Sequence, residues 1–200
     1  MMRALFKPLW LLWLSLFGLI APLGLIAKPL CVWLSRHWNF GSMWLIRTFL
    51  GIHVRYEGEV PDGPVVIACK HQSALETFAL WKPLGNPAFI IKRELLRIPI
   101  FGWFLWRSGA IAIDRSAGKA ALKAIAEQGA LRLKAGHRVV IFPEGTRQPY
   151  GAPPAYKAGG VWALYKLGYP LVPAALNTGA VWAKNGEKRA GTATICFLPP

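Results

Sequence analysis

Residues 65–76 read Val65-Val66-Ile67-Ala68-Cys69-Lys70-His71-Gln72-Ser73-Ala74-Leu75-Glu76. The five apolar residues at the start, rich in Val, predict a buried β-strand. Lys70 and His71 follow at once, and a helical segment is expected from Ala74 to Lys82. A buried strand that passes through a short polar turn into a helix is typical of an α/β fold.

The same alternation continues along the chain. Further strands are expected at residues 89–91, 110–113, 139–142 and 171–176, and helices at residues 99–107, 118–134 and 159–167. The segment 118–134 is amphipathic, with Leu122, Ile125, Gly129 and Leu133 on one face. Strands that alternate with helices predict an α/β layered fold, in which a largely parallel sheet carries flanking helices.

The composition narrows the class of protein. The chain has 200 residues, 54% hydrophobic and 16% charged, and 24 Lys and Arg against 9 Asp and Glu give a net charge of +15. Such a hydrophobic chain is not disordered, and its length suits one domain of ordinary size. Three cysteines, Cys31, Cys69 and Cys196, form neither a paired disulfide framework nor a metal-binding motif.

The N-terminal region indicates which kind of partner the positive charge of the chain would bind. No acidic residue precedes Glu57, and residues 8–27 carry no charge at all, close to the ~20 residues that cross a bilayer core. Residues 30–50 form a second apolar segment interrupted by Arg36 and Arg47, and five Trp residues precede Glu57. Trp and Arg beside apolar runs predict an anionic membrane surface as the partner and not nucleic acid.

Three interpretations of residues 8–27 remain open: a retained anchor that spans or re-enters the membrane, a cleaved signal peptide, or a buried helix of a soluble core. We favour the anchor, although Gly18, Pro22 and Gly24 would kink a single helix. The predicted division is therefore residues 1–50 as membrane helices and residues 51–200 as the second domain. Because the apolar run 194–198 is followed only by Pro199-Pro200, we expect the C-terminus to be incomplete.

Polar residues follow four of the expected strands. They are Lys70 and His71, then Lys92, then Arg115, and then the run Glu144-Gly145-Thr146-Arg147. Ligands of open α/β sheets bind beyond the carboxyl ends of the strands, so these side chains should share one rim. One histidine among several cations predicts a general base and an anionic substrate.

His71 and Glu76 are the candidate pair for proton transfer. A neutral His accepts a proton from a hydroxyl, and a carboxylate on its other ring nitrogen stabilises the imidazolium. Residues five apart in one helix point about 140° away from each other, so the pair can meet only if His71 precedes the helix. The pattern Ser73-x-x-Glu76 is typical of a capping box, which permits this arrangement. It also leaves open that Glu76 only caps the helix.

The run after the fourth strand suits a phosphate group. Arg147 offers a planar fork for phosphate oxygens, Thr146 can donate a hydrogen bond, and Gly145 allows close approach of the backbone. A phosphate would repel Glu144, so we assign it to a glycerol hydroxyl or to a nearby Arg. Arg115 and Lys92 are further candidate cations. The alternative is a Pro-Gly turn with solvated charges.

These residues resemble the motifs of the lysophosphatidic acid acyltransferase (PlsC-type glycerolipid acyltransferase) family. His71 to Glu76 resembles the first motif, in which the family usually ends on Asp. Three further motifs are matched in order by Gly109–Arg115, Ile141–Arg147 and Tyr169–Leu176. The resemblance covers roughly residues 65–176, and four ordered motifs are far more specific than one.

The resemblance implies a fold, a reaction and a location. An acyl group would move from acyl-carrier protein (acyl-ACP) or acyl-CoA to the free hydroxyl of 1-acyl-sn-glycerol-3-phosphate, forming phosphatidic acid. The hydroxyl would attack the thioester directly, without metal or cofactor. His71 would be the base and Glu76 its orienting acid, and the phosphate would be held by Lys92, Arg115, Glu144, Gly145, Thr146 and Arg147. The protein would lie on the bacterial inner membrane with its site facing the cytoplasm.

Other functions remain open at this point. Another lysolipid, such as a lyso-ornithine lipid, could replace the phosphate-bearing acceptor. A non-catalytic basic protein of the membrane surface would share the charge and the apolar N-terminus. Cys69 could form an acyl-enzyme beside His71, although a Cys in an apolar strand is more often part of the core.

Overall fold

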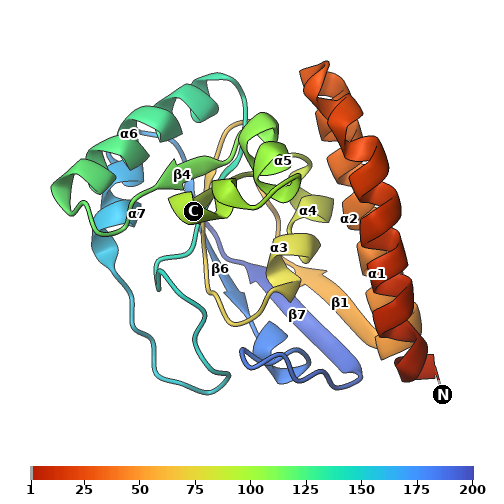
Figure 1. Ribbon diagram of the computed structural model, residues 1–200. Coiled ribbons are helices and arrows are strands. Elements are labelled where there is room, and N and C mark those ends of the chain that lie inside the picture. Colours follow the sequence, from red (N-terminus) through yellow and green to blue (C-terminus); the bar gives the residue numbers. More distant parts are fainter. Residues whose placement is uncertain (1) are drawn as a thin grey trace.

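A seven-stranded mixed sheet forms the centre of the computed structural model, which describes residues 2–200 (Figure 1). Its strands lie in the order β1-β7-β6-β2-β5-β3-β4. Their bounds are Ile52–Glu57 (β1), Val66–Cys69 (β2), Ala88–Lys92 (β3), Ile111–Ile113 (β4), Val139–Ile141 (β5), Leu171–Leu176 (β6) and Gly191–Phe197 (β7). The five strands from β6 to β4 are parallel, whereas β7 is antiparallel to β6 and β1 is parallel to β7. The predicted α/β layered fold is confirmed.

The helices lie close to their predicted ranges. They are α1 (Met2–Ile20), α2 (Lys28–Leu50), α3 (Leu75–Ala79), α4 (Trp81–Leu84), α5 (Phe101–Ser108), α6 (Lys119–Lys134) and α7 (Ala158–Tyr165). Short 3₁₀ helices are η1 (Ala21–Leu25), η2 (Arg93–Arg97) and η3 (Thr178–Ala180). The helix expected at residues 74–82 is divided into α3 and α4. On α6, Ile125, Gly129 and Leu133 are buried as predicted, but Leu122 is 38% exposed and Ala121 is buried in its place. The prediction that Leu122 belongs to the apolar face was wrong.

Helices cover the two faces of the sheet unequally. Ile67 and Cys69 of β2 pack toward α4, and Val66 packs toward α6 and α7 on the other face, which explains the unbroken apolar run of this strand. On the α7 side, β1 and β7 carry His53, Arg55, Thr192 and other polar or partly exposed side chains. These two strands alternate polar and apolar residues because only one of their faces is buried.

The N-terminal segment is a helical hairpin. Helix α1 ends at Ile20, η1 makes the turn with Pro22 and Gly24, and α2 returns beside α1 (Figure 1). The expected interruption of the long helix is confirmed. Residues 2–25 form one apolar segment long enough to cross a membrane, and only 11% of its most apolar window is buried.

Helix α2 shares a core with the sheet. Leu45, Ile46 and Leu50 pack with Leu75, Val181, Trp182 and Ala193, while Trp33, Phe40 and Trp44 of the same helix are exposed. The division at residue 50 stays a prediction, but the inner face of α2 completes the hydrophobic core beside β1 and β7.

We expect Ile46→Ala to lower the free energy of unfolding by about 2–5 kcal/mol, because it leaves a cavity at a fully buried site. Denaturant unfolding in detergent measures this change. The matched control is Trp44→Ala on the outer face of the same helix, where Trp44 is 55% exposed, and its effect should stay within about 0.5 kcal/mol. Equal losses in the two variants would contradict the assignment of an inner and an outer face.

Candidate active site

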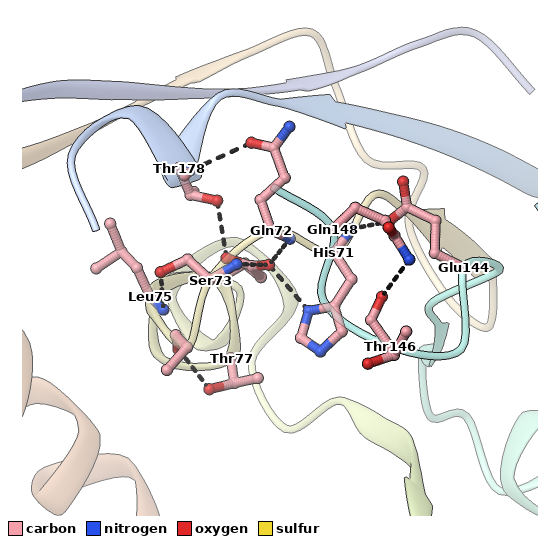
Figure 2. Close-up of polar contacts among 12 residues, drawn as sticks. His71, Gln72, Ser73, Leu75, Thr77, Glu144, Thr146, Gln148 and Thr178 are labelled. Carbon is pink, nitrogen blue, oxygen red and sulfur yellow. Dashed lines mark hydrogen bonds and ion pairs between the residues drawn. The ribbon is translucent and has the colours of Figure 1, made fainter. Parts of the chain in front are cut away.

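His71 lies in the turn between β2 and α3, outside any helix. Figure 2 shows His71 among the polar contacts of this turn. Nδ1 of His71 is 2.9 Å from Oε1 of Glu76, which is the second residue of α3. The side chain of His71 is 17% exposed and that of Glu76 is fully buried. The two residues therefore meet in the way the spacing required, with the histidine ahead of the helix.

The carboxylate of Glu76 accepts four hydrogen bonds. Besides His71, Oε1 accepts the backbone N–H groups of Gln72 at 2.7 Å and Ser73 at 2.8 Å, and Oε2 accepts the hydroxyl of Thr178 at 2.8 Å. Charge-assisted bonds of this kind offset the cost of burying a carboxylate. The two sequence interpretations are not exclusive, since one oxygen both shapes the turn and binds the imidazole.

The helix start differs from the expected capping box. Ala74 is the N-cap residue, and the hydroxyl of Ser73 accepts the N–H of Leu75 at 3.0 Å. Glu76 makes its half of the box by accepting the N–H of Ser73, but Ser73 does not bond to the N–H of Glu76.

The bond to Glu76 sets the tautomer of His71. Because a carboxylate accepts at Nδ1, that nitrogen carries the proton, and Nε2 is left with a lone pair. The ring stacks on Phe142, with centroids 4.0 Å apart and an interplanar angle of 18°. A neutral imidazole held on both sides presents Nε2 as a proton acceptor at the rim of the sheet.

The backbone of His71 is held by the segment that follows β5. Oε2 of Glu144 accepts the N–H of His71 at 2.6 Å, and the carbonyl of His71 accepts the N–H of Gln148 at 2.8 Å. Glu144 is 2% exposed and forms no ion pair with an Arg among residues 2–200. In place of the expected Arg contact, Glu144 ties the first and third motifs together.

The cations differ in how far they are engaged. Arg115, after β4, donates to the carbonyl of Gly145, whose φ of +69° suits glycine. Lys92 is exposed and pairs with Glu94 at 3.3 Å. Arg147 is half-buried and has no hydrogen bond or ion pair among the residues that the structure describes. A half-buried guanidinium that is free of protein partners is available to an anion.

A second ion pair lies beside these cations. Arg93 is 3.1 Å from Asp114. Hydrogen bonds from the hydroxyl and N–H of Ser116, followed by the charge of Arg93, hold the pKa of Asp114 below its usual value. Asp114 therefore stays ionised near neutral pH and engages Arg93, while Arg115 turns toward Gly145.

Three residues that help to form the site, Thr178, Gly179 and Lys157, were not predicted from the sequence. Thr178 reaches Glu76 across 102 positions, and the side-chain carbonyl of Gln72 accepts the N–H of Gly179 at 3.2 Å. Lys157 lies against Gly145, and its N–H donates to the carbonyl of Pro143 at 2.8 Å. Only long-range packing brings these groups to the site.

Cys69 is unsuited to nucleophilic chemistry. It is fully buried in β2, and burial, followed by the charges of Glu76 and Glu144, raises the pKa of its thiol well above the ordinary value. A thiol in that state is not a competent nucleophile, which disfavours an acyl-enzyme at this position.

An apolar cavity opens beside His71. We call it the α5 cavity; its volume is about 380 Å³, and it lies between the N-terminal hairpin, α5 and the sheet. Phe142, which stacks on His71, is part of its wall, and no Asp, Glu, Lys or Arg lines it. Among residues 2–200, no cluster of three His, Cys, Asp or Glu side chains is placed to bind a metal ion.

The fold and site define an acyltransferase. A family model described as "Acyltransferase" matches residues 51–177. The chain is 40% identical to a 1-acyl-sn-glycerol-3-phosphate acyltransferase of Pseudomonas aeruginosa, covering 94% of this chain and 74% of the relative. It is 31% identical to the human 1-acyl-sn-glycerol-3-phosphate acyltransferase alpha, covering 92% and 69%. The chain belongs to the PlsC-type 1-acyl-sn-glycerol-3-phosphate acyltransferase family, which confirms the resemblance of its motifs.

A solved structure supports the fold. The crystal structure of the LPA acyltransferase PlsC from Thermotoga maritima superimposes with a TM-score of 0.65, covering 98% of this chain and 86% of that one. The sequence identity is 23%, so this likeness establishes the shared fold alone.

Glu76→Gln separates the charge of the carboxylate from its hydrogen bonds. The amide oxygen can accept the same three N–H groups, and Thr178 can accept from the amide nitrogen, so the turn should keep its shape. An amide cannot stabilise an imidazolium, so we expect kcat to fall by about 10²-fold or more. Steady-state kinetics and thermal unfolding of the same preparation measure both effects.

Thr178→Val is the control for this substitution. It removes one hydrogen bond from Glu76 and keeps the charge, so we expect a loss of about tenfold. Near-normal turnover of the Glu76→Gln enzyme would show that the carboxylate serves only to shape the turn.

Proposed function

We propose that this protein transfers a fatty acyl group from acyl-ACP or acyl-CoA to the free hydroxyl of 1-acyl-sn-glycerol-3-phosphate, forming phosphatidic acid. The observation that carries the proposal is the His71–Glu76 pair, which leaves Nε2 of His71 unpaired, while the residue after the half-buried Arg147, Gln148, bonds to the backbone of His71. A base whose turn is tied to a segment with an available guanidinium suits a substrate that has both a hydroxyl and a phosphate.

The reaction needs one proton shuttle. Nε2 of His71 takes the proton of the acceptor hydroxyl while the hydroxyl oxygen attacks the carbonyl carbon of the thioester. The negative charge of Glu76 stabilises the imidazolium that forms. The tetrahedral intermediate then collapses, the C–S bond breaks, and the imidazolium returns the proton to the departing thiolate.

The turn after β5 is the proposed phosphate site. Arg147 would bind two phosphate oxygens, Thr146 would donate a further hydrogen bond, and Gly145 would allow the lipid to approach the backbone. Arg115 holds the carbonyl of Gly145 and keeps further donors for the same anion. Lys92 lies two strands away from His71 in the order β2-β5-β3, so we assign it to the edge of the site.

The α5 cavity is the proposed site of the donor's hydrocarbon chain. Its apolar wall includes Phe142, so a chain in the cavity would bring its carbonyl next to the ring of His71. Apolar side chains and the absence of charged ones suit a hydrocarbon chain.

The test is an assay of the protein in detergent with lysophosphatidic acid and both thioester donors. Phosphatidic acid should form, and His71→Ala should abolish it without loss of folding. Arg147→Ala should raise the KM for lysophosphatidic acid by about 30-fold, since a charge-assisted contact contributes about 2 kcal/mol. The KM for the thioester should change much less.

Lys123→Ala is the matched control, because Lys123 is an exposed cation on α6 that pairs with Glu127 at 3.8 Å and lines neither cavity. A lyso-ornithine lipid that is used as well as lysophosphatidic acid would favour the other acceptor class. Equal losses for acceptor and donor in Arg147→Ala would point to a structural role for the turn.

The N-terminal hairpin is the proposed membrane attachment. Its antiparallel helices would enter and leave the bilayer on one side, because α2 ends at the sheet. The exposed apolar residues of α1 continue over Trp33, Phe40 and Trp44, and Arg36 and Arg47 border them. Apolar and aromatic residues flanked by Arg suit the interface of an anionic membrane, which we assign to the cytoplasmic face of a bacterial inner membrane.

Replacing Trp33, Phe40 and Trp44 together by Ala should reduce flotation with anionic vesicles by severalfold, because three aromatic anchors are lost. The control is Leu131→Ala on α6. Leu131 is 65% exposed but does not belong to the hairpin, so this variant should float normally. Flotation of the triple variant at the level of the unmodified protein would contradict this placement.

A further inference from the structure

A second cavity lies on the opposite face of the sheet from the α5 cavity. We call it the α7 groove; its volume is about 610 Å³, within the usual range of ligand pockets. Ala68 and Leu171 belong to its floor, and Val161, Trp162 and Tyr165 of α7 form a wall. Trp162 and Tyr165 stack on each other and are 55% and 56% exposed.

The groove reaches the catalytic turn from the other side. Lys70 and Pro143 line it, and each is adjacent in sequence to a residue of the site, His71 and Phe142. Successive residues of a strand point to opposite faces, so the chain ends of β2 and β5 present one cavity on each face. The α5 cavity reaches Phe142, which stacks on His71, and the α7 groove reaches Lys70 and Pro143, so the two cavities approach the His71 turn from opposite faces of the sheet.

The two cavities differ in charge. No charged side chain lines the α5 cavity, whereas Lys70 lines the α7 groove. Lys157 stands between two lining residues, Tyr156 and Ala158, and lies against Gly145. Among the residues that the structure describes, a charged side chain thus lines the groove and none lines the α5 cavity, and Lys157 lies on the side of the proposed phosphate turn.

We infer that the α7 groove holds the hydrocarbon chain of the lysolipid acceptor, leaving the α5 cavity to the chain of the donor. The inference rests on the proposed function, because that reaction brings two hydrocarbon chains to one histidine. In the acceptor, a short glycerol unit joins the chain to a phosphate, so this chain belongs beside Lys70 and Lys157. In the donor, the reacting carbonyl joins an uncharged chain, which matches the uncharged cavity.

Ala175→Phe tests the assignment by filling the groove. Ala175 is exposed on β6 and lines the groove, and Phe is well tolerated in strands. The KM for a long-chain lysophosphatidic acid should rise about tenfold, equivalent to losing the burial of about two methylene groups. The KM for a 1-hexanoyl acceptor and the preference for donor chain length should not change.

Two further variants complete the design. Thr192→Phe places the same side chain on the same face of the neighbouring strand β7, outside the groove, and should leave every KM unchanged. Ala110→Leu narrows the α5 cavity and should shift the donor preference toward shorter chains, with the acceptor KM unaffected.

Two results would overturn the inference. A change of donor preference in Ala175→Phe would reverse the two chains, and unchanged kinetics for the long-chain acceptor would remove the groove from the site. The first result would also remove the donor chain from the α5 cavity, but neither result touches the proposed reaction, whose failure would instead appear as no transfer to any lysophosphatidic acid by the unmodified protein.

Discussion

The buried carboxylate of Glu76 is the interaction on which the site depends. Four donors from two parts of the chain converge on it: the imidazole of His71, two backbone N–H groups of the same turn, and the hydroxyl of Thr178. A fully buried carboxylate is costly unless its oxygens are bonded, so the turn, the first helix after β2 and the η3 segment must be in place together. The same bonds that stabilise the charge also orient the base.

The position of the site follows from the topology of the sheet. Parallel strands bring the ends of β2, β5, β3 and β4 to one rim, and the motif residues are spread over these four ends. Glu144 and Gln148, which follow the neighbouring strand β5, hold the backbone of His71, so the proposed base is tied to the proposed phosphate turn by two hydrogen bonds. A group fixed through both its backbone and its ring needs little rearrangement to act as that base.

Because helices cover the two faces of the sheet unequally, each face has its own apolar cavity, as the proposed lipid substrates require. The N-terminal hairpin and α5 enclose an uncharged cavity on one face, and α7 leaves an apolar groove with a lysine on the other. The inner face of α2 belongs to the core while its outer face is exposed and aromatic. One helix thereby joins the reacting rim to the surface that we assign to the membrane.

Local patterns determined much of this protein before any packing was known. Apolar runs set apart six of the seven strands, counting the run 194–198 that overlaps β7. Gly18, Pro22 and Gly24 marked the break in the hairpin, and the spacing of His71 and Glu76 required a histidine ahead of its helix. Strand β1 and the antiparallel pairing of β7 were not predicted, since a half-exposed strand such as His53–Arg55 has no distinctive apolar run. Glu144 was assigned to substrate or Arg, because its chemistry alone does not reveal a backbone partner 73 residues away. Thr178, Lys157 and the two cavities were likewise decided by the tertiary structure, since contacts between distant segments depend on how strands are ordered in the sheet and not on local sequence.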